Sequence, residues 1–157
     1  MPGGAPGDMK EEQDILDTLD ANQFAVLATQ SEGQPHTSLV AITPIDGVRT
    51  LLFATYRSTR KYRSISMDGR VSLFFGAQAT EPFGTQRPLL TAHGFASEAP
   101  DDKRREMAAA HADRHPYLLD LLGSTDAALV CVEVAAYQLV RSIDDVRWYD
   151  PSNRALM

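Results

Sequence analysis

The chain has 157 residues, of which 43% are hydrophobic, and its formal net charge is −6 at pH 7. These values predict one domain with an ordinary core, and they disfavour non-specific binding to nucleic acid, which needs a basic surface. The single cysteine, Cys131, excludes an intramolecular disulfide, and no apolar run reaches the roughly 20 residues of a membrane span. The N-terminus lacks the charged and apolar regions of a signal peptide. We therefore expect a cytoplasmic protein with neither a nucleic-acid nor a membrane partner.

The first part of the chain alternates apolar runs with turn residues. Residues 1–8 are rich in Gly and Pro, so we expect a flexible lead before a single domain at residues 9–157. Asp8 and Glu11 resemble a capping box, and the apolar positions that follow have helical spacing. Strand-forming runs and the turns between them are predicted at 24–29, 36–42 and 49–55, and at 31–34 and 44–47. This meander indicates antiparallel pairing.

The middle of the chain contains a short polar helix between strands. The helix is predicted at 58–67, with Ser58 or Thr59 as its N-cap. Two alternating runs predict further strands at 70–75 and 89–97, separated by a loop at 76–86. Gly94, inside the second of these strands, predicts a bend or a close backbone approach.

The last third of the chain begins with a second helix. Pro100 stands at a favoured first position, and the helix is predicted to run to His115, where Pro116 interrupts it. The remaining apolar runs predict a short helix at 117–122, a long buried strand at 127–134 that residues 137–141 continue, and a last short strand at 146–149. Six or seven short strands with helices between them predict an α+β barrel or sandwich.

Three histidines attract attention because of their positions. His111 and His115 are four residues apart, which is the spacing of a metal-binding pair, but no Glu stands between them as in a zinc-protease motif. We expect them at an exposed helix end, where the dipole favours positive charge, and we expect no metal site. His93 alternates with apolar neighbours and is expected to be structural.

Four cations surround the first turn of the helix at 58–67, namely Arg57, Arg60, Lys61 and Arg63. The backbone dipole makes this end positive, so each cation costs about 0.3–1 kcal/mol unless an anion compensates it. A bound phosphate reverses the cost, because free backbone N–H groups and the dipole both favour an anion. Successive helical residues point about 100° apart, so only some cations can face one ligand, and Arg60 and Lys61 are the best pair. The alternative is a solvated basic face.

The order of these elements resembles the pyridoxamine 5′-phosphate oxidase-like FMN-binding proteins. In that family a strand ends in an aromatic or small residue and Thr, and a Ser/Thr-Arg-Lys sequence, a helix and an Arg-Val-Ser-Leu strand follow. The matching residues here are Thr55-Tyr56, Thr59-Arg60-Lys61 and Arg70-Val71-Ser72-Leu73. The resemblance extends back to Ala25 and forward to Val134.

The resemblance implies an α+β fold: a six- to seven-stranded antiparallel split β-barrel with peripheral helices. It also implies a homodimer with FMN at the subunit interface. The residues that it assigns to the cofactor are Arg60 and Lys61 for the phosphate, with Ser58 or Thr59 assisting; Thr55 and Tyr56 along the ribityl chain or ring edge; Thr37, Ser38 and Val40 beneath the isoalloxazine; and Gln86 or Arg87 reaching the flavin of the other subunit.

Two departures and two alternatives qualify the function that the resemblance implies. The oxidase carries an Arg and a Lys in the strand at 37–42, which has neither here, and its C-terminal Trp and Arg setting has no match at 146–154. We therefore expect a divergent relative, an FMN-dependent oxidoreductase acting on an unidentified small molecule. The alternatives on the same fold are a non-catalytic flavin- or haem-binding protein and an F420-dependent reductase, since F420 also carries a phosphate. The candidate axial ligands for a haem are His36, His93, His111 and His115.

Overall fold

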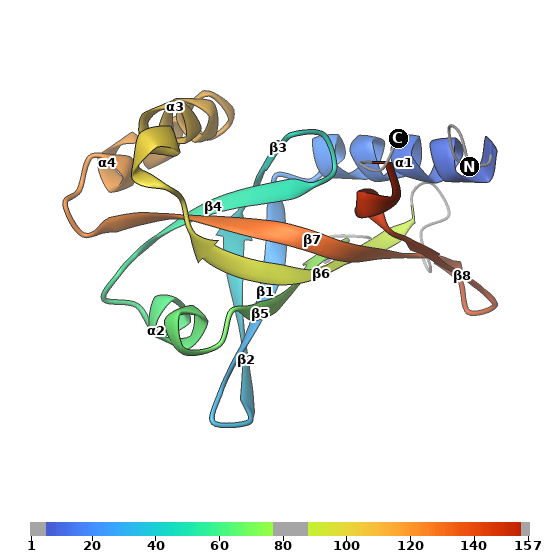
Figure 1. Ribbon diagram of the computed structural model, residues 1–157, viewed down its shortest axis with the longest axis horizontal. Coiled ribbons are helices and arrows are strands. Elements are labelled where there is room, and N and C mark those ends of the chain that lie inside the picture. The colour runs from blue at the N-terminus through green and yellow to red at the C-terminus, as the bar shows by residue number, and fades with distance from the viewer. Residues whose placement is uncertain (1–5, 77–87, 155–157) are drawn as a thin grey trace.

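The computed structural model describes residues 6–76 and 88–154, which form one antiparallel sheet curled into a split β-barrel with helices at its periphery (Figure 1). The strands are β1 (Phe24–Ser31), β2 (Gln34–Ala41), β3 (Thr43–Ile45), β4 (Thr50–Tyr56), β5 (Arg70–Phe75), β6 (Leu89–Glu98), β7 (Ala127–Ser142) and β8 (Asp145–Tyr149). The α-helices are α1 (Pro6–Ala21), α2 (Arg60–Met67), α3 (Arg104–Arg114) and α4 (Leu119–Leu122). The predicted fold class is confirmed, with eight strands in place of six or seven.

The strands follow the order β2-β1-β5-β6-β7-β4-β3, and β8 also pairs with β7. One edge of β7 pairs with β6 over residues 130–140. The other edge pairs with β4 over residues 127–133 and with β8 from residue 137 onward. The prediction that residues 137–141 continue the strand at 127–134 is confirmed, and this long strand joins three others.

Two clusters of apolar side chains hold the sheet in this shape. The larger cluster fills the barrel and includes the fully buried Leu27, Phe53, Phe75, Leu90 and Tyr137, with Ile15 and Leu19 contributed by α1. The smaller cluster joins Leu52, Leu129 and Cys131 on the other face of β4 and β7 to Met107, Ala108 and Leu122 of α3 and α4. Because helices cover this second face, the first half of β7 is apolar on both sides and lacks the alternation of a half-exposed strand.

Gly94 marks a close approach of two backbones, as predicted. The β6–β7 register shifts between His93 and Gly94, which leaves Ala135 as an extra residue on β7. A Cβ atom on Gly94 would lie 2.2 Å from the carbonyl oxygen of Glu133, closer than side-chain carbons approach backbone oxygens. Glycine is therefore required at this bulge.

The structure corrects three expected boundaries. The turn expected at 44–47 begins later, because Thr43–Ile45 form the edge strand β3, in which Pro44 needs no N–H; the turn lies at 46–49. Helix α1 begins at Pro6, so Asp8 lies within the helix and does not cap it. The helix expected from Pro100 starts as a 3₁₀ turn at Asp101–Lys103, before α3.

Candidate functional site

The split in the barrel lies near β2, β4 and the start of α2. Strand β2 pairs with β1 alone, and β3 covers only residues 50–52 of β4, so both strands keep edges without a partner among residues 6–76 and 88–154. Helix α2 follows the end of β4 and packs against β1, and Figure 1 shows it between β4 and the β1–β2 hairpin. Unpaired N–H and C=O groups and a helix N-terminus thus lie in one part of the molecule.

Thr59 organises the first turn of α2. It is the N-cap, with extended backbone angles, and its Oγ1 accepts a hydrogen bond from the Tyr62 N–H at 3.4 Å. The same oxygen lies 2.8 Å from the Tyr56 carbonyl oxygen and 2.9 Å from Oγ1 of Thr55, which is buried. The prediction that Ser58 or Thr59 caps the helix is confirmed for Thr59. Its hydroxyl is engaged within the chain, as is that of Thr55.

Two of the four cations of this turn bind groups of the protein itself. The Arg57 guanidinium pairs with Glu98, Nη2 to Oε2 at 2.5 Å, and donates to the Thr125 carbonyl oxygen. The hydrogen bond from Arg57, helped by one from Tyr62, holds the pKa of the Glu98 carboxyl below its usual value despite partial burial. Arg63 donates to the Ser58 carbonyl oxygen at 2.9 Å.

Arg60 and Lys61 have no ion-pair partner in the part of the chain that the structure describes. Arg60 is exposed and Lys61 is half-buried, and both belong to the first turn of α2, where backbone N–H groups lack helical acceptors. Ser58, by contrast, donates through its hydroxyl and its N–H to Oδ2 of Asp126, at 3.0 and 3.4 Å. A carboxylate of the chain therefore already occupies one anion position beside this turn.

The remaining residues that the sequence assigned to the cofactor lie on β2, at the end of β4, or outside the described residues. In β2, Ser38 shares a face with the buried Val40, whose side chain belongs to the barrel core, whereas Thr37 is exposed on the other face. Only the backbone of Val40 is thus available to a ligand. The Tyr56 side chain is 41% exposed at the end of β4. Gln86 and Arg87 lie outside the described residues.

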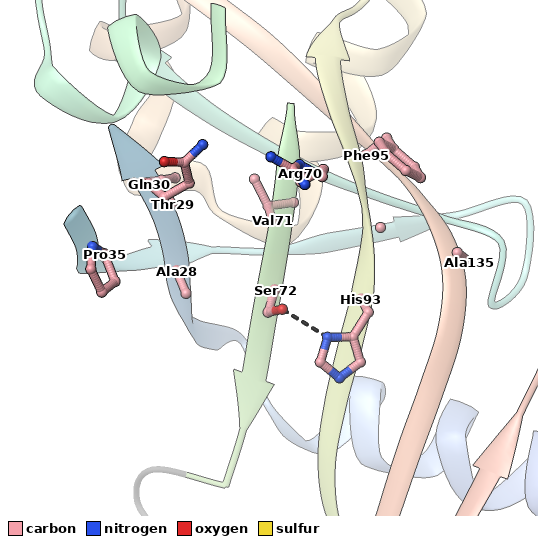
Figure 2. A pocket seen from close by; sticks show the side chains of 11 residues that line it. Ala28, Thr29, Gln30, Pro35, Arg70, Val71, Ser72, His93, Phe95 and Ala135 are labelled. Carbon is pink, nitrogen blue, oxygen red and sulfur yellow. Dashed lines mark hydrogen bonds between the residues drawn. The ribbon is translucent and has the colours of Figure 1, made fainter. Parts of the chain in front are cut away.

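A groove of about 480 Å³ lies on the outer face of the sheet, away from Arg60 and Lys61. Figure 2 shows its lining from β1, β2, β5, β6 and β7. Small residues such as Ala28 and Gly94 leave it open, and His93 and Phe95 border it. His93 Nδ1 is hydrogen-bonded to Ser72 Oγ at 2.8 Å, and its ring stacks on Trp148 with centroids 5.7 Å apart. Sequence reasoning missed this groove, because only the register across five strands brings its residues together.

His111 and His115 lie far from the exposed position expected of them. Both side chains are 0% exposed. The C-terminal turn of α3 packs against the chain between β2 and β3, which covers them. Among the described residues, no group of three or more His, Cys, Asp and Glu side chains is arranged to hold a metal ion.

The described residues thus define a split-barrel protein in which β4 leads into a helix whose first turn carries Arg60 and Lys61. The chain belongs to the pyridoxamine 5′-phosphate oxidase family, whose sequence model matches residues 11–141. No curated protein matches the sequence. No helix in the described ranges is both long enough and apolar enough to cross a membrane.

Solved structures with the same fold differ in what they are described as binding. A haem-binding protein from Mycobacterium smegmatis superposes with a TM-score of 0.80 at 18% identity, over 92% of this chain and 60% of its own. A Clostridium acetobutylicum protein of the pyridoxine phosphate oxidase family gives a TM-score of 0.72 at 16% identity, over 93% and 98% of the two chains. HutZ, a haem storage protein from Vibrio cholerae, gives 0.68 at 19% identity, over 82% and 94%. At these identities, the shared property is the fold.

Proposed function

We propose that the protein binds FMN in the split of the barrel and is a flavin-dependent oxidoreductase acting on a small molecule. The observation that carries the proposal is the state of the four cations at α2. Glu98 neutralises Arg57, and Arg63 is hydrogen-bonded to a backbone carbonyl oxygen. Among the described residues, Arg60 and Lys61 have no ion-pair partner, and they lie beside the free N–H groups of a helix N-terminus.

The charge of this turn fits a phosphate monoester. Such a phosphate carries about −1.5 to −2 charges at pH 7, close to the combined charge of Arg60 and Lys61. Arg60 can offer a planar fork and Lys61 a point charge from a neighbouring direction. The phosphate of F420 is a diester with a single negative charge, so the two free cations favour FMN over F420.

The neighbouring strands provide a place for the rest of the cofactor. The unpaired edge of β2 offers backbone donors and acceptors along residues 37–40, and Ser38 adds a hydroxyl. The exposed ring of Tyr56 lies where β4 enters α2. Bound FMN would supply one- and two-electron redox chemistry, while these residues hold and orient it.

The direct test is to identify what the native protein carries. Mass spectrometry of the ligand released from purified protein should find FMN, and titration of the stripped protein with FMN should quench the flavin fluorescence at one site per chain. Release of F420 or haem, or an absence of saturable FMN binding, would overturn the proposal.

We also propose that the protein is a homodimer, with the outer sheet face as part of the interface. Strand register places Leu39 and Trp148 in one row across β2, β1, β5, β6, β7 and β8, and they are 62% and 58% exposed. Phe95 on the same sheet face is 58% exposed. Large apolar side chains gathered on one face are typical of a protein–protein interface.

Light scattering should therefore report twice the 17.2 kDa chain mass at micromolar concentration. The variants Leu39→Glu and Trp148→Glu should shift the mass toward one chain, because each buries an unpaired charge in the interface. Ile143→Glu is the control, since Ile143 is 74% exposed in the turn before β8. A monomeric wild type would contradict the dimer.

Haem is the second candidate, and His93 is the residue that favours it. Its Nδ1 is fixed by Ser72, and its other ring nitrogen has no partner among the described residues. An imidazole oriented in this way can ligate iron. The structural relatives from Mycobacterium and Vibrio are described as haem proteins. Titration with haemin distinguishes the two candidates. A shift of the Soret band that is lost in the variant His93→Ala and kept in His36→Ala supports haem.

A further inference from the structure

We propose that the buried pair His111 and His115 is an acid-sensitive attachment, which holds α3 against the end of β2 when neutral and releases it when protonated. The attachment itself is independent of any ligand. Its consequence for the cofactor, discussed below, rests on the proposed function.

The contacts of the histidine pair lead to one short segment. His111 Nδ1 is hydrogen-bonded to Thr43 Oγ1 at 2.7 Å. His115 Nε2 donates to the Ile42 carbonyl oxygen at 2.8 Å, and Arg114 Nε donates to the same oxygen at 3.0 Å. Ile42 and Thr43 join β2 to β3, so three polar contacts from the last turn of α3 and its C-cap hold this junction.

The surroundings cannot accommodate added positive charge. The two ring centroids are 4.9 Å apart, both side chains are fully buried, and His111 Nε2 has no hydrogen-bond partner within residues 6–76 and 88–154. Arg114 already places a cation beside them, and the Tyr117 hydroxyl lies 3.4 Å from His115 Nδ1. A protonated pair would put like charges in contact without solvent.

Among the described residues, no carboxylate on the packed elements offsets that charge, and only the Ile42 carbonyl favours it. Strand β3 presents the Thr43 hydroxyl, and β7 presents the Cys131 thiol, which packs on Met107 one turn before His111. None of the carboxylates in the described residues is among the groups that shift either histidine pKa.

The sign of the pH dependence follows from these contacts. Burial, then His115 and then Arg114 lower the pKa of His111 to about 4. Burial also lowers the pKa of His115, although its bond to the Ile42 carbonyl opposes the change. Both folded values lie below the ordinary value of 6.5. The attachment is therefore complete above pH 6.5 and weakens as the pH falls toward 4.

Loss of the attachment would act on the proposed cofactor strand. Ile42 directly follows β2, whose unpaired edge is the proposed support of the flavin ring. Release of the junction removes the α3 contacts to the residue that follows this strand and leaves the pairing with β1 as its support. Acid should therefore weaken cofactor binding through β2, in addition to the loss that follows from protonation of the cofactor's own phosphate.

Hydrogen exchange of the ligand-free protein at pH 7.5 and pH 5.0 tests the attachment. After correction for the intrinsic exchange rate, peptides covering α3 and residues 42–45 should lose at least tenfold protection at pH 5.0, while β7 keeps its protection. The variant His111→Asn/His115→Gln places neutral amide nitrogens near Nδ1 and Nε2, and should show no such loss. Equal protection of the wild type at both pH values, or the same loss in the variant, would overturn the proposal.

Two further measurements keep the test decisive. If the double variant does not fold, NMR titration of the wild-type imidazole signals replaces it. Both histidine rings should stay neutral at pH 6, and the amide signals of α3 should shift over the same pH range in which the two rings become protonated. Ring signals that titrate near 6.5 refute the attachment. FMN retention at the two pH values, compared between the wild type and the His111→Asn/His115→Gln variant, tests the consequence separately, because phosphate protonation affects both proteins alike. A wild type that loses no more FMN at pH 5.0 than the variant refutes the consequence. Protein that binds no FMN even at pH 7.5 refutes the proposed cofactor but leaves the exchange result to judge the attachment.

Discussion

Replacing Arg60 and Lys61 together with alanine should weaken FMN binding on the order of 100-fold. Each side chain can make a charge-assisted hydrogen bond to the phosphate, and at a partly solvated helix end we assign about 1.5 kcal/mol to each. The sum of about 3 kcal/mol corresponds to roughly two powers of ten in Kd. The fold should persist, because neither side chain has an ion-pair partner within the described ranges. Fluorescence titration with FMN measures the effect.

The matched control removes the same charges elsewhere. Lys10 on α1 and Arg105 on α3 are exposed, so Lys10→Ala/Arg105→Ala lowers the net charge equally without touching α2. This control should bind FMN within about twofold of the wild type. If both double variants lose affinity alike, the effect is long-range electrostatics; if neither does, the phosphate lies elsewhere.

The single variant Arg57→Ala should act mainly on stability, because it leaves Glu98 without its ion-pair partner.

Replacing Gly94 with alanine should destabilise the protein by about 3 kcal/mol or more. The added Cβ would meet the Glu133 backbone oxygen at 2.2 Å, and neither backbone can retreat without breaking the β6–β7 ladder. For a chain of this size, such a loss lowers Tm by roughly 6–12 °C. A thermal melt followed by circular dichroism measures it.

Gly123 supplies the control for this substitution. It has φ −82° after α4, and a Cβ there would lie 3.5 Å from the Leu119 carbonyl oxygen, which is ordinary contact. Gly123→Ala should therefore change stability by no more than about 0.5 kcal/mol. Equal melting temperatures for the two variants would show that the bulge can yield, contrary to the close approach seen at Gly94.

Local signals in the sequence were enough for most elements. The strand predicted at 70–75 matches β5 residue for residue, because alternation and an Asp-Gly stop define it without help from distant parts of the chain. Strand β3 was missed, since its three residues are a strand only through pairing with β4, and Pro44 reads locally as a turn. The eighth strand arises from this omission.

The residues of the candidate site also fall into those that local signals predicted and those whose contacts depend on distant parts of the chain. Helix geometry alone singled out Arg60 and Lys61 among four cations, and they are the two that the described structure leaves unpaired; that they bind a phosphate stays a prediction. The partners of the other cations could not be foreseen, because Glu98 is 41 residues from Arg57. The burial of His111 was equally hidden, because its partner Thr43 lies 68 residues away and helical spacing does not say which face another segment covers.

The acids beside α2 have a consequence for the order of events in the life of the protein. Glu98 and Asp126 supply negative charge where four cations crowd one turn, so the chain does not need a cofactor to hold that turn together. Folding and loading of the proposed cofactor are then separate steps, and the ligand-free protein should be a compact species that melts cooperatively.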